Sequence, residues 1–407
     1  MKNVLGFIVI TLLLIGCKKD DPAPTQTDVV PPWVTGQSAE AVFGHTTFTA
    51  TGLDTAGQST IPGPWGLAVS STGTLFVVDQ RAHRILRYDN ADTKASGANA
   101  DGVLGQANFT NRNWNFNLSG STPSANGVET PVSIALDPSG NLFVLDQGNS
   151  RVLRFAGAAS KANGAAAEGV LGQPNFTSKG FGSTATTFFS PQGIAVDASG
   201  NLYVADGSNN RVLRFNSAAS KANGAAADAV FGQTSFTASA NGVGNNKMWN
   251  PTSVAVDKNG NLYVGERGNC RILIFLNAQT KANGDSADIV LGKSDFANGS
   301  TPTVANRGNI YLPYAMAVDQ KNDLYVADGG FNRLMVFYNA PAKKNGDSAD
   351  VVIGKSNFTN GTITAASETN IGQPYGVAVQ SATGKLFVTC YSNSRVLRFQ
   401  AKSSLMP

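Results

Sequence analysis

The sequence predicts an all-β protein, a six-bladed β-propeller closed by the pairing of its N-terminal strand into the last blade. Three observations predict this fold. One phrase of 25 residues occurs six times, a shorter strand signal also occurs six times, and the first short signal precedes the first phrase. The phrases recur every 60 to 67 residues, and such a period indicates an array of one supersecondary unit.

Each phrase contains three strand signals. In the copy Pro191–Phe215, residues 193–196 are small and apolar and suit a strand near a crowded axis. An Asp-Ala-Ser-Gly turn then leads to a second strand at 201–205, and a third strand follows at 211–215. The lead prolines of the six copies are Pro64, Pro131, Pro191, Pro251, Pro313 and Pro374.

The fourth strand of each unit is expected after a polar link. Its copies are residues 41–44, 102–105, 169–172, 229–232, 289–292 and 351–354. No copy follows the last phrase, so the chain begins with an outer strand and ends one strand short. We expect residues 41–44 to complete the sixth sheet beside residues 395–399, because closure removes the exposed edges of a linear stack.

The N-terminus resembles a bacterial lipoprotein signal. Residues 1–16 form a short basic start and an apolar run too short for a permanent membrane span. The run ends at Gly16-Cys17, as in a lipobox, which implies lipidation at Cys17. Ordinary signal cleavage is the alternative. We expect a flexible tether at residues 17–38, its Lys-Lys-Asp-Asp start resembling the export signal of Bacteroidetes-type surface lipoproteins, and a single propeller domain at residues 39–401.

Composition excludes some classes of partner and of chemistry. The formal net charge is +4 and only 14% of the residues are charged, both signs recurring in every repeat, which argues against binding to nucleic acid. Cys270 and Cys390 fall in the fourth and sixth repeats, too far apart for a disulfide, so we expect two free thiols. The chain has two histidines, His45 and His83.

The repeated phrase resembles the NHL repeat. It carries the proline, glycine, hydrophobic, alanine, valine and aspartate of that motif, followed by Asn-Leu-Tyr-Val-Ala-Asp and Asn-x-Arg-hydrophobic, most fully in Pro131–Phe155 and Pro191–Phe215. The resemblance covers about residues 39–400 and implies a six-bladed propeller. The family includes lyases that hold zinc through histidines on several blades, and His45 and His83 do not match such a set.

Strand direction sorts the connections onto two faces. The turns between second and third strands share one face with the long links between blades, and we call it the loop face. The hairpins between first and second strands lie on the opposite, hairpin face. Asp79, Asp146, Asp206 and Asp328 each precede an arginine by five residues, and this recurrence favours a structural ion pair over a unique site. Binding is expected on the loop face, whose connections are longer and more varied.

Departures from the repeat supply the candidate binding residues. Closure makes blades 5, 6 and 1 neighbours, so Tyr314, Tyr375 and Trp65, which follow lead prolines, should form an aromatic arc at the central opening. The alternative is that they wedge between blades. Other candidates are the irregular turn residues and the polar or aromatic residues near the opening, namely Arg81, Gln192, Trp249, Glu266, Arg267 and Tyr391.

The features above support two hypotheses about function. The leading hypothesis is a binding scaffold that recognises a protein, peptide or glycan and is lipid-anchored to the outer membrane of the cell envelope, facing either the cell surface or the periplasm. No cofactor, metal or nucleic acid is expected. The alternative is an enzyme, resembling the metal-dependent lyases or lactonases built on similar propellers.

Overall fold

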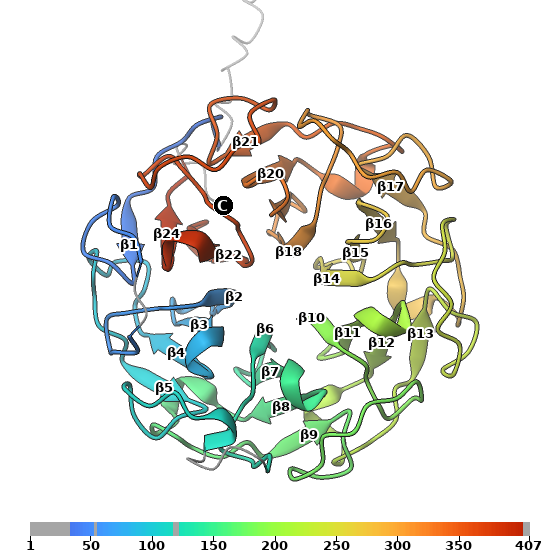
Figure 1. Ribbon diagram of the computed structural model, residues 1–407. Coiled ribbons are helices and arrows are strands. Elements are labelled where there is room, and N and C mark those ends of the chain that lie inside the picture. The colour runs from blue at the N-terminus through green and yellow to red at the C-terminus, as the bar shows by residue number, and fades with distance from the viewer. Residues whose placement is uncertain (1–32, 53–54, 117–121, 402–407) are drawn as a thin grey trace, which may run out of the picture.

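The computed structural model describes residues 33–52, 55–116 and 122–401. In this part of the chain, six four-stranded antiparallel sheets surround a central axis (Figure 1). The predicted six-bladed β-propeller is therefore confirmed. No helix among the described residues is long and apolar enough to cross a membrane.

Five blades are each built from four consecutive strands, numbered from the axis outward. Blade 1 contains β2 (Pro64–Val69), β3 (Leu75–Asp79), β4 (Arg84–Tyr88) and β5 (Gly102–Leu104). Blade 2 contains β6 (Pro131–Leu136), β7 (Leu142–Asp146), β8 (Arg151–Phe155) and β9 (Gly169–Leu171). Blade 3 contains β10 (Pro191–Val196), β11 (Leu202–Asp206), β12 (Arg211–Phe215) and β13 (Ala229–Phe231).

The remaining blades follow the same order. Blade 4 contains β14 (Pro251–Val256), β15 (Leu262–Glu266), β16 (Arg271–Phe275) and β17 (Ile289–Leu291). Blade 5 contains β18 (Pro313–Val318), β19 (Leu324–Asp328), β20 (Arg333–Phe337) and β21 (Val351–Ile353). Blade 6 contains β22 (Val377–Val379), β23 (Leu386–Cys390), β24 (Arg395–Phe399) and, as its outer strand, β1 (Ala41–Phe43).

Short 3-10 helices occupy the turns. On the loop face they are η1 (Gln80–Ala82), η2 (Trp114–Phe116), η3 (Gln147–Asn149), η5 (Gly207–Asn209) and η9 (Tyr391–Asn393). On the hairpin face they are η4 (Ala158–Ser160), η6 (Ala218–Ser220), η7 (Ala278–Thr280) and η8 (Ala340–Ala342).

The ring closes as predicted, through β1. This strand pairs antiparallel with β24, and Val42 lies opposite Leu397. The Val42 N–H also donates to Ser96 Oγ of blade 1, at 3.2 Å. Blade 2 is joined to blade 3 in the same way, because the Val170 N–H donates to Asn223 Oδ1 at 3.0 Å. The junction between the chain ends therefore uses the same contact as an ordinary junction between blades.

The packed region begins before residue 39, where the tether was expected to end. Trp33 is only 2% exposed, and its indole N–H donates to the Tyr325 hydroxyl at 2.7 Å. Gln37 donates to the carbonyl of Gln400, at the hairpin end of blade 6. A large apolar ring with one polar atom packs well where that atom finds a partner, which accounts for the position of Trp33. The signal, Cys17 and the first part of the tether lie outside the described residues.

A buried arginine at the start of each third strand fastens the loop face to the sheets. In blade 3, Arg211 Nε donates to Asp206 at 2.8 Å, and both side chains are fully buried. Its Nη2 donates to the Thr184 and Thr187 carbonyls of the link before the blade, at 2.8 and 3.1 Å. Its Nη1 donates to the Phe236 carbonyl of the link after it. One guanidinium therefore holds two long links.

The ion pairs predicted from the repeat are confirmed. The described pairs are Asp79–Arg84, Asp146–Arg151, Asp206–Arg211, Glu266–Arg271 and Asp328–Arg333, with N–O distances of 2.5 to 2.9 Å. A buried charge is tolerated only when it is paired and hydrogen-bonded, and each of these pairs meets that condition. Glu266, a candidate binding residue, belongs to this group and is completely buried.

Blade 6 lacks the carboxylate. Cys390 occupies its position, and burial raises the pKa of this thiol against the opposing effect of Arg395, so the group is neutral at pH 7. Arg395 is fully buried and still donates through Nη2 to the Ser367 and Asn370 carbonyls, both at 2.9 Å. Its Nε finds no hydrogen-bond partner among the described residues. Both Cys390 and Cys270 are free and buried, in agreement with the prediction.

Replacing Cys390 by aspartate should therefore stabilise the protein. The new carboxylate would accept the Arg395 Nε–H and neutralise its charge, and such a bond contributes about 1.5–3 kcal/mol. The free energy of unfolding, measured in denaturant, should rise for Cys390→Asp relative to Cys390→Asn, which adds a similar volume without charge. Equal stability of the two variants would show that Arg395 does not need a counter-ion.

Candidate functional site

Three aromatic residues meet at the loop-face end of the central axis. Trp65, Tyr314 and Tyr375 each follow the lead proline of an inner strand, in blades 1, 5 and 6. The ring centroids of Trp65 and Tyr375 lie 4.3 Å apart, and those of Tyr314 and Tyr375 lie 4.5 Å apart. All three side chains are partly exposed, so the arc predicted from ring closure forms and presents ring surface to solvent.

Tyr391 and Arg81 extend this arc at its blade 1 end. The Tyr391 ring lies 5.0 Å from that of Tyr375 and 5.4 Å from that of Trp65. The Arg81 guanidinium lies 4.9 Å from the Tyr391 ring centroid, and its Nε donates to the Tyr391 hydroxyl at 3.1 Å. This is a cation–π contact with an added hydrogen bond, and it fixes a positive charge beside the aromatic rings.

Arg267 lies at the other end, on blade 4. Its side chain is exposed, and its charge acts on the Tyr375 hydroxyl. Burial, together with Tyr314 and Tyr391, outweighs this effect and raises the pKa of Tyr375 to about 12. The hydroxyl therefore keeps its proton at physiological pH and can donate a hydrogen bond.

The half of the opening formed by blades 2 and 3 is polar. Gln192 is partly exposed and donates to the Ser190 carbonyl at 3.3 Å. Gln147, also partly exposed, donates to the Pro191 carbonyl at 3.2 Å. We call the mouth the opening bounded by the aromatic arc and this polar half, that is by Trp65, Arg81, Gln147, Gln192, Arg267, Tyr314, Tyr375 and Tyr391.

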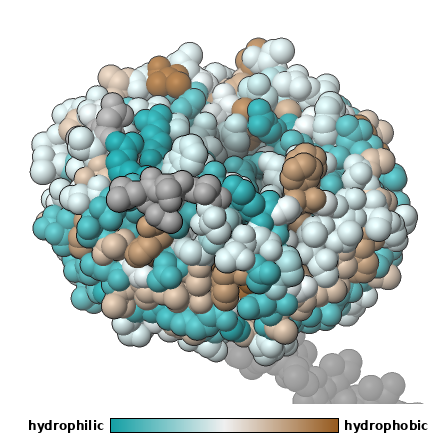
Figure 2. Space-filling view, turned by 60° about the horizontal axis from the view of Figure 1, so that its bottom comes forward, coloured by the Kyte–Doolittle hydropathy of each residue, from teal (hydrophilic) through white to brown (hydrophobic). Residues whose placement is uncertain are grey.

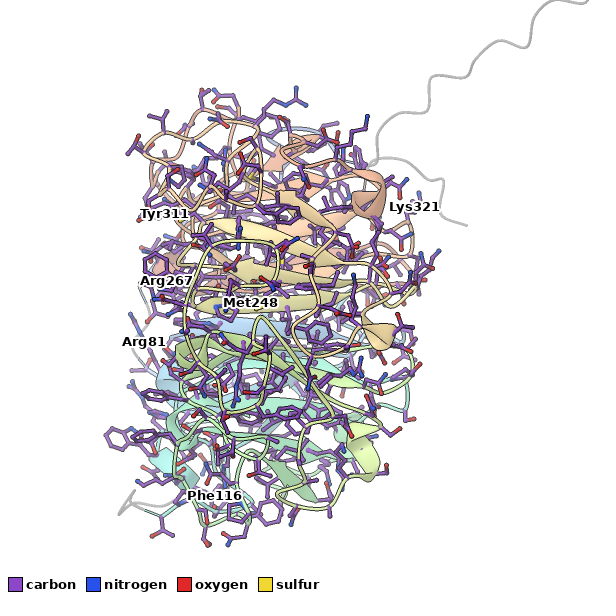
Figure 3. All side chains as sticks on the ribbon, turned by 90° about the vertical axis from the view of Figure 1, so that its right-hand side faces the viewer. Arg81, Phe116, Met248, Arg267, Tyr311 and Lys321 are labelled. Atoms are coloured by element: carbon purple, nitrogen blue, oxygen red, sulfur yellow. The ribbon has the colours of Figure 1, made fainter. Side chains whose placement is uncertain are left out.

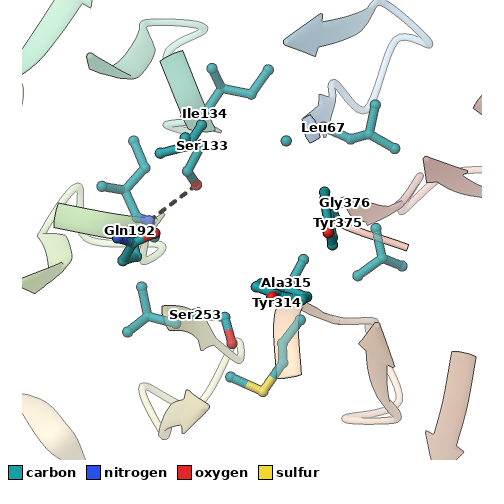
Figure 4. A pocket seen from close by; sticks show the side chains of 16 residues that line it. Leu67, Ser133, Ile134, Gln192, Ser253, Tyr314, Ala315, Tyr375 and Gly376 are labelled. Atoms are coloured by element: carbon teal, nitrogen blue, oxygen red, sulfur yellow. Dashed lines mark hydrogen bonds between the residues drawn. The ribbon is translucent and has the colours of Figure 1, made fainter. Parts of the chain in front are cut away.

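Below the mouth, side chains of the inner strands line a tunnel along the axis (Figure 4). Its cavity measures about 50 Å³ and is lined by inner-strand residues such as Ser133, Ile194 and Met316. The Ile194 N–H donates to Ser133 Oγ at 3.1 Å, which ties two neighbouring inner strands together. The lining of the tunnel also includes Gln192, Tyr314 and Tyr375 of the mouth, so a ligand on the mouth would lie over the entrance of the tunnel.

A wider cavity of about 600 Å³ opens on the hairpin face. Val69, Leu136 and Val196, the last residues of three inner strands, form its apolar part. The carboxylates of Asp137 and Asp197 in this cavity stabilise their own hairpin turns, because each accepts hydrogen bonds from backbone N–H groups of its turn at 2.9 Å. The cavity is also lined by exposed polar residues, namely Ser71, Thr72, Ser139, Gln320 and Ser381.

The structure brings most of the predicted site residues together. Only Trp249 and Glu266 are not at the mouth: Trp249 lies outside it on blade 4 with 45% of its surface exposed, and Glu266 is buried under Arg271. Sequence reasoning missed Gln147. The signal was present, because Gln147 directly follows the repeat aspartate, as Arg267 directly follows Glu266.

His83 lies in the loop-face turn next to Arg81 and has a structural contact. It adopts a left-handed backbone with φ of 49°, and its Nδ1 accepts the Thr130 N–H at 3.0 Å. Asn210 has the equivalent place in blade 3, where its Oδ1 accepts the Asn250 N–H at 2.8 Å. Burial, with the nearby Arg112 charge, lowers the pKa of His83 from 6.5 to about 4.

Among the described residues, no three His, Cys, Asp or Glu side chains lie close enough together to hold a metal ion.

The NHL repeat is matched at residues 188–215 and 248–275, which are copies in blades 3 and 4. The chain is thus a six-bladed β-propeller that contains NHL repeats. No curated protein matches the sequence.

Comparison with solved structures bears on the architecture alone, through a structure with a TM-score above 0.5. A protein of unknown function from Bacteroides thetaiotaomicron is 14% identical with a TM-score of 0.53, over 88% of this chain and 75% of that chain. A gluconolactonase from Xanthomonas campestris is 15% identical with a TM-score of 0.48, over 91% and 95%. Virginiamycin B lyase from Staphylococcus aureus is 13% identical with a TM-score of 0.43, over 86% and 88%. Identities this low carry no argument about activity.

The low pKa of His83 should make stability depend on pH. Between pH 6.5 and about 4 the unfolded chain binds more protons than the folded one, so stability falls as the pH falls through this range. His83→Asn keeps an acceptor for the Thr130 N–H without a titrating ring. The stability difference between variant and wild type should shift in favour of the variant by about 3 kcal/mol from pH 7 to pH 4. A difference constant across that range would contradict the assignment.

Proposed function

We propose that this protein is a lipid-anchored binding scaffold of the cell envelope, and that it binds a protein, peptide or glycan across the mouth. The observation that carries the proposal is the mouth itself, where partly exposed aromatic rings lie between two arginines above the central tunnel. Aromatic rings and arginines are the residues that dominate recognition surfaces.

The position of the N-terminal segment supports an orientation in which the mouth points away from the membrane. Trp33 contacts Tyr325, whose hydroxyl donates to Asp319 in a hairpin of blade 5. In Figure 3, Arg81 and Arg267 lie on the opposite side from Lys321, which belongs to the same hairpin as Asp319. A chain anchored at Cys17 would therefore join the ring on the hairpin side, and the mouth would point away from the membrane.

Crosslinking in intact cells tests which face binds. The photoreactive residue p-benzoylphenylalanine would replace Gln192, at the mouth, or Lys258, an exposed hairpin-face residue. We expect a crosslinked product from the mouth position and none from the hairpin position. Products from the hairpin position alone would contradict the proposal.

Removing Cys17 tests the anchor. Cys17→Ala should abolish labelling of the protein by a fatty-acid analogue and move it from the membrane fraction to the soluble fraction, because two or more acyl chains are needed for stable anchoring. Cys270→Ala is the matched control and should remain in the membrane fraction, since the Cys270 thiol is buried in blade 4. Membrane retention of Cys17→Ala would show that the lipobox resemblance is misleading.

A further inference from the structure

An exposed tryptophan continues the mouth outward on blade 4. Trp249 lies against the backbone of Gly268, where an added Cβ would come within 2.3 Å of its Cγ. Gly268 and Arg267 are in the same turn, and their N–H groups donate to the Trp249 and Asn250 carbonyls, both at 3.0 Å. The order from the rim inward is therefore a flat, exposed indole, then a guanidinium, then the aromatic arc.

Blade 1 repeats this order on its own side. Trp114 is 55% exposed, and its ring centroid lies 5.9 Å from that of His83. His83 ends the turn that contains Arg81, which in turn contacts Tyr391 of the arc. Going outward from the mouth, a guanidinium is again followed by an exposed indole.

Blades 1 and 4 are diametrically opposite in a ring of six (Figure 1). Trp249, Arg267, the aromatic arc, Arg81 and Trp114 thus follow one another along one side of the opening, from blade 4 through blades 5 and 6 to blade 1, and we call this series the track. Figure 2 shows the loop face tilted upward, with separate hydrophobic patches on a largely hydrophilic and neutral surface. A ligand that uses the whole track has to be long, because both ends lie away from the central opening.

The charged side chains of the loop face indicate whether that ligand is anionic or cationic. Among the described loop-face residues that are not buried, six are cationic and three are anionic, namely Arg81, Arg112, Lys179, Lys247, Arg267 and Arg307 against Glu129, Asp295 and Glu368. The loop face that carries the track therefore has an excess of cationic side chains.

We propose that the track binds an extended acidic polysaccharide, a chain of uronic-acid type, an inference that rests on the proposed function and names its ligand class. A pyranose ring has an apolar face of C–H bonds and a periphery of hydroxyls. The aromatic rings fit that face, while the tyrosine hydroxyls and Gln192 fit the periphery. The guanidinium groups of Arg81 and Arg267 suit carboxylates, which they can bind in a bidentate manner.

An acidic peptide fits the site less well. Peptides are held through an open sheet edge, an apolar groove for a helix, or pockets for single side chains. The mouth instead offers ring surfaces, with Trp65, Tyr375 and Tyr314 in a row at centroid distances of 4.3 and 4.5 Å. Such a row suits a chain of sugar rings better than a chain of unlike side chains.

Titration calorimetry of the full-length protein with oligogalacturonates of two to ten residues tests this. Affinity should rise with length until the chain spans the track, and should fall with added salt because the contacts are ionic. Arg267→Gln and Arg81→Gln should each weaken binding about tenfold, the loss of one charge-assisted hydrogen bond. Trp249→Ala and Trp114→Ala should weaken only the long oligomers. Lys258→Gln and Ile363→Ala, off the track, should have no effect.

The outcomes separate this inference from the proposed function. No binding of oligogalacturonates, or equal binding of polyglutamate, would overturn the polysaccharide assignment while crosslinking at the mouth could still succeed. Affinity independent of length, with no effect of Trp249→Ala or Trp114→Ala, would overturn the track. Gly268→Ala offers a second variant: its methyl group would meet Trp249 Cγ at 2.3 Å and the Trp249 carbonyl oxygen at 2.7 Å, so it should displace the indole together with its backbone and reproduce the Trp249→Ala loss.

Discussion

The buried arginine at the start of each third strand is the interaction on which the loop face depends. Its guanidinium donates one N–H to a carboxylate and the others to carbonyls of two different links. Arg211 donates in this way to Asp206 and to the carbonyls of Thr184, Thr187 and Phe236. Links of this length would otherwise lack enough backbone hydrogen bonds to stay in one conformation. Five of these arginines have a carboxylate, and Arg395 shows that the carbonyl contacts form even without one.

Because that frame is the same in every blade, the mouth differs between blades at few positions. These are the residue after the lead proline and the first or second residue after the repeat carboxylate position, and in blades 3, 4 and 5 the two compensate each other in size. The Tyr314 ring covers the backbone of Gly329, and Gln192 covers Gly207, whereas Arg267 follows Glu266 in the blade where Thr252 is small and buried. Recognition chemistry is therefore set by few side chains on a repeated scaffold.

The fold could be predicted from the sequence because the spacing of the repeats and the count of strand signals indicate the same architecture. The spacing of the lead prolines, the six outer-strand signals and the missing seventh copy all required closure of residues 41–44 on residues 395–399. The aromatic arc followed from closure, since it needs only the order of blades. The position of Glu266 could not be predicted in the same way. A glutamate in place of the repeat aspartate can extend to solvent or pair with the buried arginine, and only the packing in the folded protein shows that it pairs with Arg271. Trp33 was missed because one indole among prolines carries no periodic signal.

Closure through β1 has a consequence for how the chain is made. This strand is synthesised before every blade, yet β24, its only strand partner, comes within the last residues of the array. During synthesis the outer edge near Val42 waits unpaired while more than three hundred residues follow it. Blades 1 to 5 can form one after another. The ring stays open, and β1 keeps an unpaired edge, until the strands of blade 6 have been synthesised.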